Sequence, residues 1–93
     1  MEQQTYEHPD RVAWYRALIE EWTAQAPHVA IVDAMVAAWV SPYTSLYGVR
    51  HYAPTQVWAA TVEEALEALC AQVYEDVSAD YRDLVGERQV VRV

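Results

Sequence analysis

The chain has 93 residues, of which 54% are hydrophobic, and its formal net charge is −8 at pH 7. This hydrophobic content excludes the disordered class, and the single cysteine excludes a scaffold held together by internal disulfides. The negative charge argues against direct binding to nucleic acid or to an anionic membrane surface, because both need clustered Lys and Arg.

The length predicts one small domain with a modest core. We expect residues 1–8 to form a flexible N-terminus and residues 9–93 to form a single globular domain. The polar N-terminus lacks the apolar stretch of a signal peptide. The longest apolar run, residues 29–40, is shorter than the roughly 20 residues of a membrane span. We therefore expect a cytoplasmic protein that does not associate with membranes.

A first helix is predicted to begin near Pro9 and Asp10, since proline and an acidic side chain both suit the first turn. The apolar residues that follow recur every three or four positions, as on one face of a helix. They are Val12, Tyr15, Ile19, Trp22 and Ala26. Pro27 is expected to end or kink this amphipathic helix.

Residues 28–40 are apolar nearly all round, which predicts a second, centrally buried helix that ends at Ser41 and Pro42. Asp33 is the one acidic residue within it. We favour an exposed Asp33, since a buried aspartate is rare unless it is paired. The alternative is a buried carboxylate with a raised pKa and a functional role.

β-branched and aromatic residues then become frequent, and residues 46–52 and 56–60 are predicted to pair as a hairpin around a turn at residues 53–55. Gly48 inside the first of these segments suggests a bulge or a close backbone approach.

Thr61 and Glu64 have the spacing of a capping box, and they predict the start of an amphipathic helix at Val62. Residues 78–85 are predicted to form one further short helix, with Gly86 as its C-cap. Residues 87–93 alternate as Arg88, Val90 and Arg92 on one face against Gln89, Val91 and Val93 on the other, which predicts a C-terminal strand.

The predicted fold class is therefore α+β. It combines two N-terminal helices, a β-hairpin, a capped amphipathic helix and a C-terminal strand, in a small antiparallel or mixed sheet covered by helices. An all-α bundle is the alternative, if residues 44–60 form loop and helix instead of a hairpin.

The strongest functional signal is residues 41–60, which contain no Asp or Glu. The flanking segments are acidic: residues 1–40 hold six acids and two arginines (net −4), and residues 61–93 hold eight acids and three arginines (net −5). Tyr, Trp and Arg dominate the hot spots of protein interfaces. The predicted contact residues are Tyr43, Tyr47, Arg50, His51 and Tyr52. We expect a non-catalytic interaction module whose protein partner is itself or another protein, acting as a homodimer or as a small accessory or inhibitory subunit.

A second hypothesis starts from the acidic face of the capped helix. Its residues are Glu63, Glu64, Glu67 and Glu75. Such a face usually only keeps a small protein soluble. It could also imitate a row of phosphates and occupy the basic groove of a nucleic-acid-handling protein. In size and charge sign the chain resembles small phage inhibitors that work as nucleic-acid mimics.

A third hypothesis is a small enzyme or ligand-binding domain in which Arg50 binds an anion and His51 acts as a general acid or base. No nucleophile elbow, glycine-rich phosphate loop or paired-carboxylate motif supports it, so we expect no enzyme. The three histidines are far apart in the sequence, and Cys70 is in mid-helix beside Glu67. We therefore expect neither a metal site nor a cofactor nor a reactive thiol.

Overall fold

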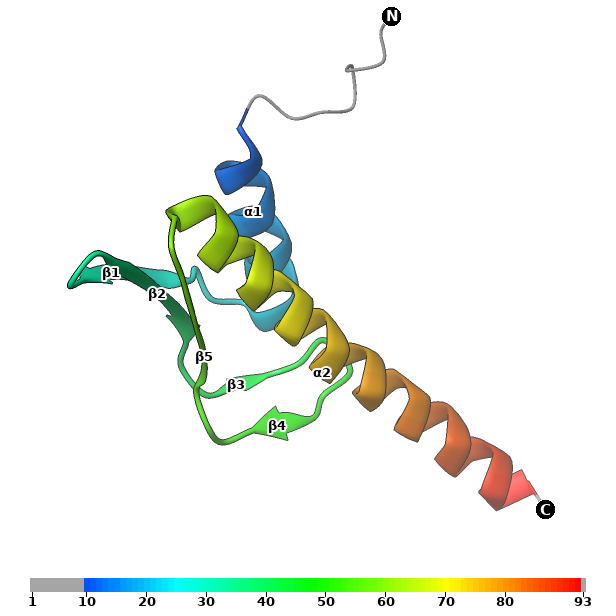
Figure 1. Cartoon of the computed structure of the whole chain (residues 1–93). Coiled ribbons are helices and arrows are strands. Elements are labelled where there is room, and N and C mark those ends of the chain that lie inside the picture. The colour runs from blue at the N-terminus through cyan, green and yellow to red at the C-terminus, as the bar shows by residue number, and fades with distance from the viewer. Residues whose placement is uncertain (1–9, 93) are drawn as a thin grey trace, which may run out of the picture.

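The computed structural model describes residues 10–92, with side-chain surroundings as far as Gly86. The elements are α1 (Arg11–Thr23), β1 (His28–Val32), β2 (Met35–Val40), β3 (Tyr43–Thr44), β4 (Arg50–His51), β5 (Thr55–Ala59) and α2 (Val62–Arg92) (Figure 1). They form a small α+β fold with an antiparallel three-stranded sheet, β1-β2-β5, and a two-stranded sheet, β3-β4. The α+β class is therefore confirmed, and the all-α alternative is wrong. The segment expected to be flexible, residues 1–8, lies outside the described residues.

Helix α1 corresponds to the first predicted helix and begins as the sequence indicates. The Asp10 carboxylate accepts a hydrogen bond from the amide of Ala13 at 3.0 Å, which satisfies one of the unpaired donors of the first turn. The helix ends at Thr23, before Pro27, because Ala24 adopts a left-handed conformation with φ of 61°. The amide of Ala24 still donates to the carbonyl of Glu20 at 2.8 Å.

The predicted second helix, residues 28–40, is wrong: this segment is the β1–β2 hairpin. The strands pair from His28 opposite Trp39 to Val32 opposite Met35. The two turn residues, Asp33 and Ala34, have φ of 51° and 66°, as a type I′ turn requires. A uniformly apolar run fits a buried helix and a buried strand equally well, so periodicity alone did not separate them. Asp33 is exposed, as expected.

The predicted hairpin of residues 46–52 with residues 56–60 is also wrong, although both segments contribute strands. Strand β5 pairs with β2, with Trp58 opposite Ala37, while β4 pairs with β3, with His51 opposite Tyr43. Strand partners are set by the tertiary fold, and a turn signal at residues 53–55 is compatible with either pairing. Gly48 lies in the β3–β4 loop with φ of 87°, and no atom lies within 4 Å of where its Cβ would be.

Helix α2 begins as predicted and continues further than predicted. The Thr61 hydroxyl accepts from the amide of Glu64 at 3.1 Å, which is one half of the capping box. The helix then runs without a break to Arg92, so Gly86 is no C-cap and residues 87–92 form no strand. Helix growth is cooperative, since each added residue gains a backbone hydrogen bond once the first turn exists.

Both helices cover one face of the three-stranded sheet (Figure 1). Val36, Ala38 and Val40 of β2 face the helices and pack in the core with Leu66 and Leu69 of α2. Side chains alternate along a strand, so the other face carries the remaining residues. We call this the outer sheet face, which consists of His28, Ala30, Val32, Met35, Ala37, Trp39, Gln56 and Trp58. The last turns of α2 extend past the sheet (Figure 1).

Candidate functional site

A groove of about 440 Å³ lies along α2, and we call it the aromatic groove. Three segments form it. Helix α1 contributes Trp22, and the β3–β4 loop contributes Leu46 and Tyr47. Helix α2 supplies the remaining lining, which is Tyr74, Glu75, Val77, Ser78, Tyr81 and Arg82. A concave, mainly apolar surface with a few polar groups is the usual form of a binding site.

Two aromatic contacts hold the groove together, each of which joins α2 to another segment. The rings of Trp22 and Tyr74 lie 5.5 Å apart at an interplanar angle of 51°. The rings of Tyr47 and Tyr81 lie 5.2 Å apart at 47°. Both are the tilted geometry that aromatic pairs prefer. Tyr47, Tyr74 and Tyr81 nevertheless stay exposed, so a partner could reach their ring faces.

The β3–β4 loop, which carries Leu46 and Tyr47, is fixed by Ser45. This residue is buried, and its amide donates to the carbonyl of Val49 at 2.8 Å. Its hydroxyl accepts from the amide of Tyr47 at 3.2 Å, and its carbonyl accepts from the amide of Gly48 at 2.9 Å. The positive φ of Gly48 permits this tight turn. The loop therefore presents Leu46 and Tyr47 in a defined position.

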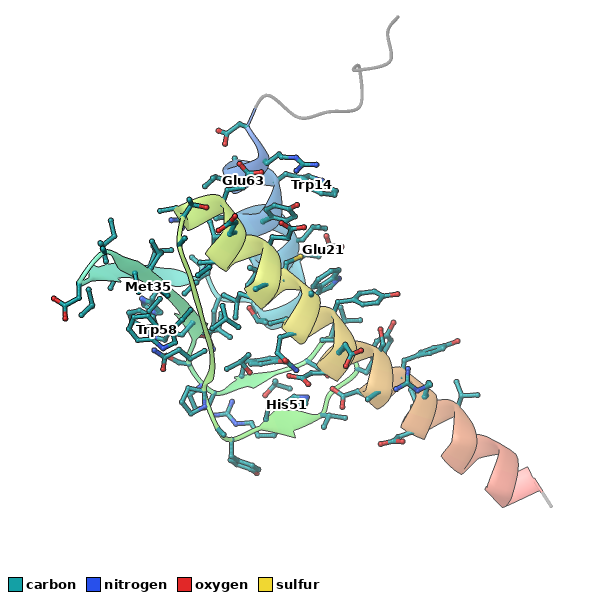
Figure 2. All side chains as sticks on the ribbon, in the orientation of Figure 1. Trp14, Glu21, Met35, His51, Trp58 and Glu63 are labelled. Atoms are coloured by element: carbon teal, nitrogen blue, oxygen red, sulfur yellow. The ribbon has the colours of Figure 1, made fainter. Side chains whose placement is uncertain are left out.

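A short polar contact between β4 and α2 holds the end of the same loop against the helix. Nε2 of His51 lies 2.7 Å from Oδ2 of Asp80, which is buried (Figure 2 labels His51). The His51 ring also stacks on Tyr43, with centroids 4.9 Å apart. One nitrogen and one face of the imidazole are thus engaged with the protein, and this arrangement anchors the strand to the helix.

Tyr43 lies beneath this contact and is 1% exposed. Its hydroxyl has no hydrogen-bond partner among the residues that the structure describes. Burial, followed by the nearby carboxylates of Asp76 and Asp80, raises the pKa of Tyr43 from its ordinary value of 10.0 to about 12. Tyr43 is therefore part of the core and not of the surface.

The five predicted contact residues do not form one patch. Tyr43 is in the core, His51 is held against Asp80, and Tyr47 reaches the aromatic groove. Arg50 is exposed, donates to the Thr44 hydroxyl at 3.3 Å and lies 5.7 Å above the ring of Tyr52. Because neighbouring residues of a strand point to opposite faces, Arg50 and His51 are not brought together for a common ligand.

The four acidic residues of the predicted acidic face are distributed along α2 and differ in their surroundings. Glu63 pairs with Arg11 of α1 at 3.3 Å between Oε2 and Nη1. Glu64 and Glu67 are exposed, and Glu75 borders the aromatic groove. The nucleic-acid-mimic hypothesis stays a prediction.

The described part of the chain shows neither a cluster of metal ligands nor an exposed thiol. Between residues 10 and 92, no three His, Cys, Asp or Glu side chains lie together so that they could hold a metal ion. Cys70 is buried in the core, and burial, together with Glu67, raises the pKa of its thiol. No helix in this range is long and apolar enough to cross a membrane.

Sequence reasoning missed most of the groove. Trp22 was placed on the apolar face of the first helix, and Tyr74 and Tyr81 were not singled out. A signal for the tyrosines existed: they are seven residues apart, so they share a face of α2 that borders the core stripe. No local sequence pattern links that face to Trp22 or to Leu46, because these residues meet only in the folded chain.

Comparisons of the chain with protein-family models, with curated proteins and with solved structures find no match.

Proposed function

We propose that this chain is a non-catalytic protein–protein interaction module that binds a segment of a partner protein in the aromatic groove. The observation that carries the proposal is the meeting of Trp22, Tyr47, Tyr74 and Tyr81 from three segments around one groove. Tyr and Trp bury large areas at a small entropic cost, and they dominate binding energy in measured interfaces. A role as an accessory or inhibitory subunit in the cytoplasm is part of this proposal.

The chemistry of the groove indicates the kind of segment it would hold. Leu46, Val77 and the aromatic rings favour apolar anchor side chains, while Glu75, Ser78 and Arg82 offer polar contacts at its edge. The chain's net charge of −8 accelerates encounter with a positively charged partner. The expected ligand is therefore a short segment with apolar anchors and a net positive charge.

A displayed library of random peptides, selected on the wild-type protein, tests the proposal without a known partner. Selected peptides should combine aromatic or aliphatic residues with Lys or Arg. Tyr74→Ala and Tyr81→Ala should each weaken their binding about tenfold or more, since an interface hot spot contributes more than about 1.4 kcal/mol.

Tyr52→Ala is the matched control, because Tyr52 is 79% exposed, belongs to the acid-free segment and lies outside the groove. It should leave peptide binding unchanged. Peptides that tolerate Tyr74→Ala and Tyr81→Ala but lose binding with Tyr52→Ala would move the site to the Arg50–Tyr52 surface and refute the groove.

A further inference from the structure

The outer sheet face is a second apolar surface, separate from the aromatic groove. Neither helix covers it, and Met35 and Trp58 lie exposed on it (Figures 1 and 2). Trp58 is directly opposite Ala37, and His28 stacks on Trp39 with centroids 5.3 Å apart. The face therefore presents ordered aromatic side chains without a cover from its own chain.

Charge decides which partner suits this face. Its eight residues include no Asp, Glu, Lys or Arg, although the chain as a whole has a net charge of −8. Two copies of so acidic a chain repel each other wherever carboxylates would meet. Two copies that meet through the outer sheet face bring no like charges of this face together.

The face has an exposed side chain at one end of β2 and a hollow at the other. Met35 protrudes at one end of β2 and is 41% exposed. A shallow hollow of about 390 Å³ lies at the other end, between Trp39, Pro42 and Pro54. Ala37 lies midway between Met35 and Trp39 and has the smallest side chain of these three positions of β2; it is only 2% exposed and lies opposite the exposed Trp58. A twofold axis that passes over Ala37, between the two sheets, would make the two β2 strands antiparallel and place each Met35 over the hollow of the other copy.

We infer that a second copy of this chain binds the outer sheet face, with Met35 of each copy in the hollow beside Trp39 of the other. Such reciprocal contacts are what a twofold-symmetric interface requires. Methionine suits this role, because its unbranched side chain adapts to irregular gaps. This interface shares no residue with the aromatic groove, so one of the two proposals can be wrong while the other holds.

The dimer should depend on concentration. Strands of five or six residues at ordinary spacing give a face of only about 20 by 15 Å, so the two copies together bury well under the roughly 1,200 Å² of a stable specific interface, and the dimer is weak. Light scattering after size-exclusion chromatography, at loadings up to about 1 mM, should therefore show the mass rise from one chain toward two.

Met35→Glu should return that mass to 10.6 kDa, the mass of one chain, because it places a carboxylate in the apolar hollow of the other copy. Ile31→Glu is the matched control. It adds the same charge near the same hairpin tip, at a residue that is 69% exposed and points to the opposite face of the sheet. It should leave the dimer intact. A wild type that stays at the mass of one chain, or two variants that behave alike, would overturn the inference.

A cysteine pair tests the geometry even if Met35→Glu does not fold. Residues 35 and 39 are four positions apart along β2, about 14 Å, so cysteines there cannot bridge within one chain. Under mild oxidation, Met35→Cys combined with Trp39→Cys should give a covalent dimer, because a twofold axis over Ala37 places residue 35 of one copy opposite residue 39 of the other. Met35→Cys alone should not, since the twofold axis keeps the two copies of residue 35 apart. Equal cross-linking by both proteins, or by neither, would refute this arrangement.

Discussion

Ala24 and Ala34 adopt left-handed backbone conformations, with φ of 61° and 66°. A Cβ atom makes this region unfavourable by roughly 1 kcal/mol, and glycine avoids the penalty. Ala24→Gly and Ala34→Gly should therefore each raise the free energy of unfolding by up to about 1 kcal/mol, as measured by urea denaturation.

The control is the same change at Ala71, which is exposed in the middle of α2. There glycine loses helix propensity, so Ala71→Gly should lower stability by about 1 kcal/mol. A loss of stability at all three positions would mean that residues 24 and 34 are not left-handed.

Tyr43 should make stability depend on alkaline pH. Its pKa is raised from 10.0 to about 12, so the folded state favours the neutral phenol. The stability from this group is complete below pH 10.0 and is lost as the pH rises toward about 12. Urea unfolding across this range should show that Tyr43→Phe loses less stability than the wild type, by on the order of 2 kcal/mol.

Tyr52→Phe, at an exposed tyrosine, should follow the wild-type curve. Parallel curves for Tyr43→Phe and the wild type would contradict a buried Tyr43 with a raised pKa. Near neutral pH, Tyr43→Phe should not destabilise the protein, because the phenyl ring can still stack on His51 and the deleted hydroxyl has no partner among the described residues.

At the scale of elements, a substitution at Gly86 tests whether helix α2 continues through this residue or whether a helix ends there with Gly86 as its C-cap. In a helix that continues through it, Gly86→Ala should increase helicity and raise stability by up to about 1 kcal/mol, since alanine is the better helix former. At a left-handed C-cap the same change would be destabilising. Far-ultraviolet circular dichroism during thermal unfolding distinguishes these results, and a loss of helicity would restore the C-cap prediction.

The contact between His51 and Asp80 should couple β4 to α2. Asp80→Ala deletes the acceptor and should cost about 1–3 kcal/mol, because His51 is then left partly buried without its partner. The double-mutant cycle with His51→Ala should give a coupling free energy of at least about 0.5 kcal/mol in urea unfolding. Additive single effects would mean that the two side chains do not interact.

The sequence predicted those elements whose signals are local. Asp10 caps α1, and Thr61 caps α2, because a cap depends on a few neighbouring residues. The segment of residues 28–40 was mistaken for a helix, since its turn of Asp33 and Ala34 lacks the glycine that usually marks a two-residue hairpin. The pairing of β5 with β2 depends on contacts between distant residues, which no local pattern contains.

The site was predictable to the same limited extent. The acid-free segment led to the prediction of Tyr47 as a contact residue, and Tyr47 does line the aromatic groove. The segment itself divides between the core, the groove and the outer sheet face, because alternate strand residues point in opposite directions. Trp22, Tyr74 and Tyr81 join Tyr47 only through the packing of α1 and the loop against α2.

At the scale of the whole molecule, two surfaces without a net charge interrupt an otherwise acidic chain, since Glu75 and Arg82 offset each other in the aromatic groove. The aromatic groove lies along α2, and the outer sheet face lies on the side of the sheet that the helices leave open. The groove is proposed to bind a segment of another protein, and the outer sheet face is proposed to bind a second copy of the chain. The nucleic-acid-mimic hypothesis makes a contrasting prediction, in which exposed Glu64 and Glu67 carry the binding.

Reversal of charge separates these alternatives. Glu64→Arg with Glu67→Arg should leave the affinity for groove-selected peptides within about threefold, because only long-range attraction changes. The measurement is fluorescence anisotropy of a labelled peptide at two salt concentrations, since screening suppresses that long-range part. A loss of binding comparable to that of Tyr74→Ala would place the acidic face, and not the groove, at the centre of recognition.

The four tryptophans allow the most direct test, because each indole N–H gives a separate signal in a two-dimensional NMR spectrum and the four report on different surfaces. Trp22 lies in the groove, Trp39 and Trp58 on the outer sheet face, and Trp14 toward the start of α1. Titration of dilute, nitrogen-15-labelled protein with a selected peptide should shift the signal of Trp22 and leave the other three in place. Shifts of Trp39 and Trp58 with an unmoved Trp22 would contradict the groove as the binding site.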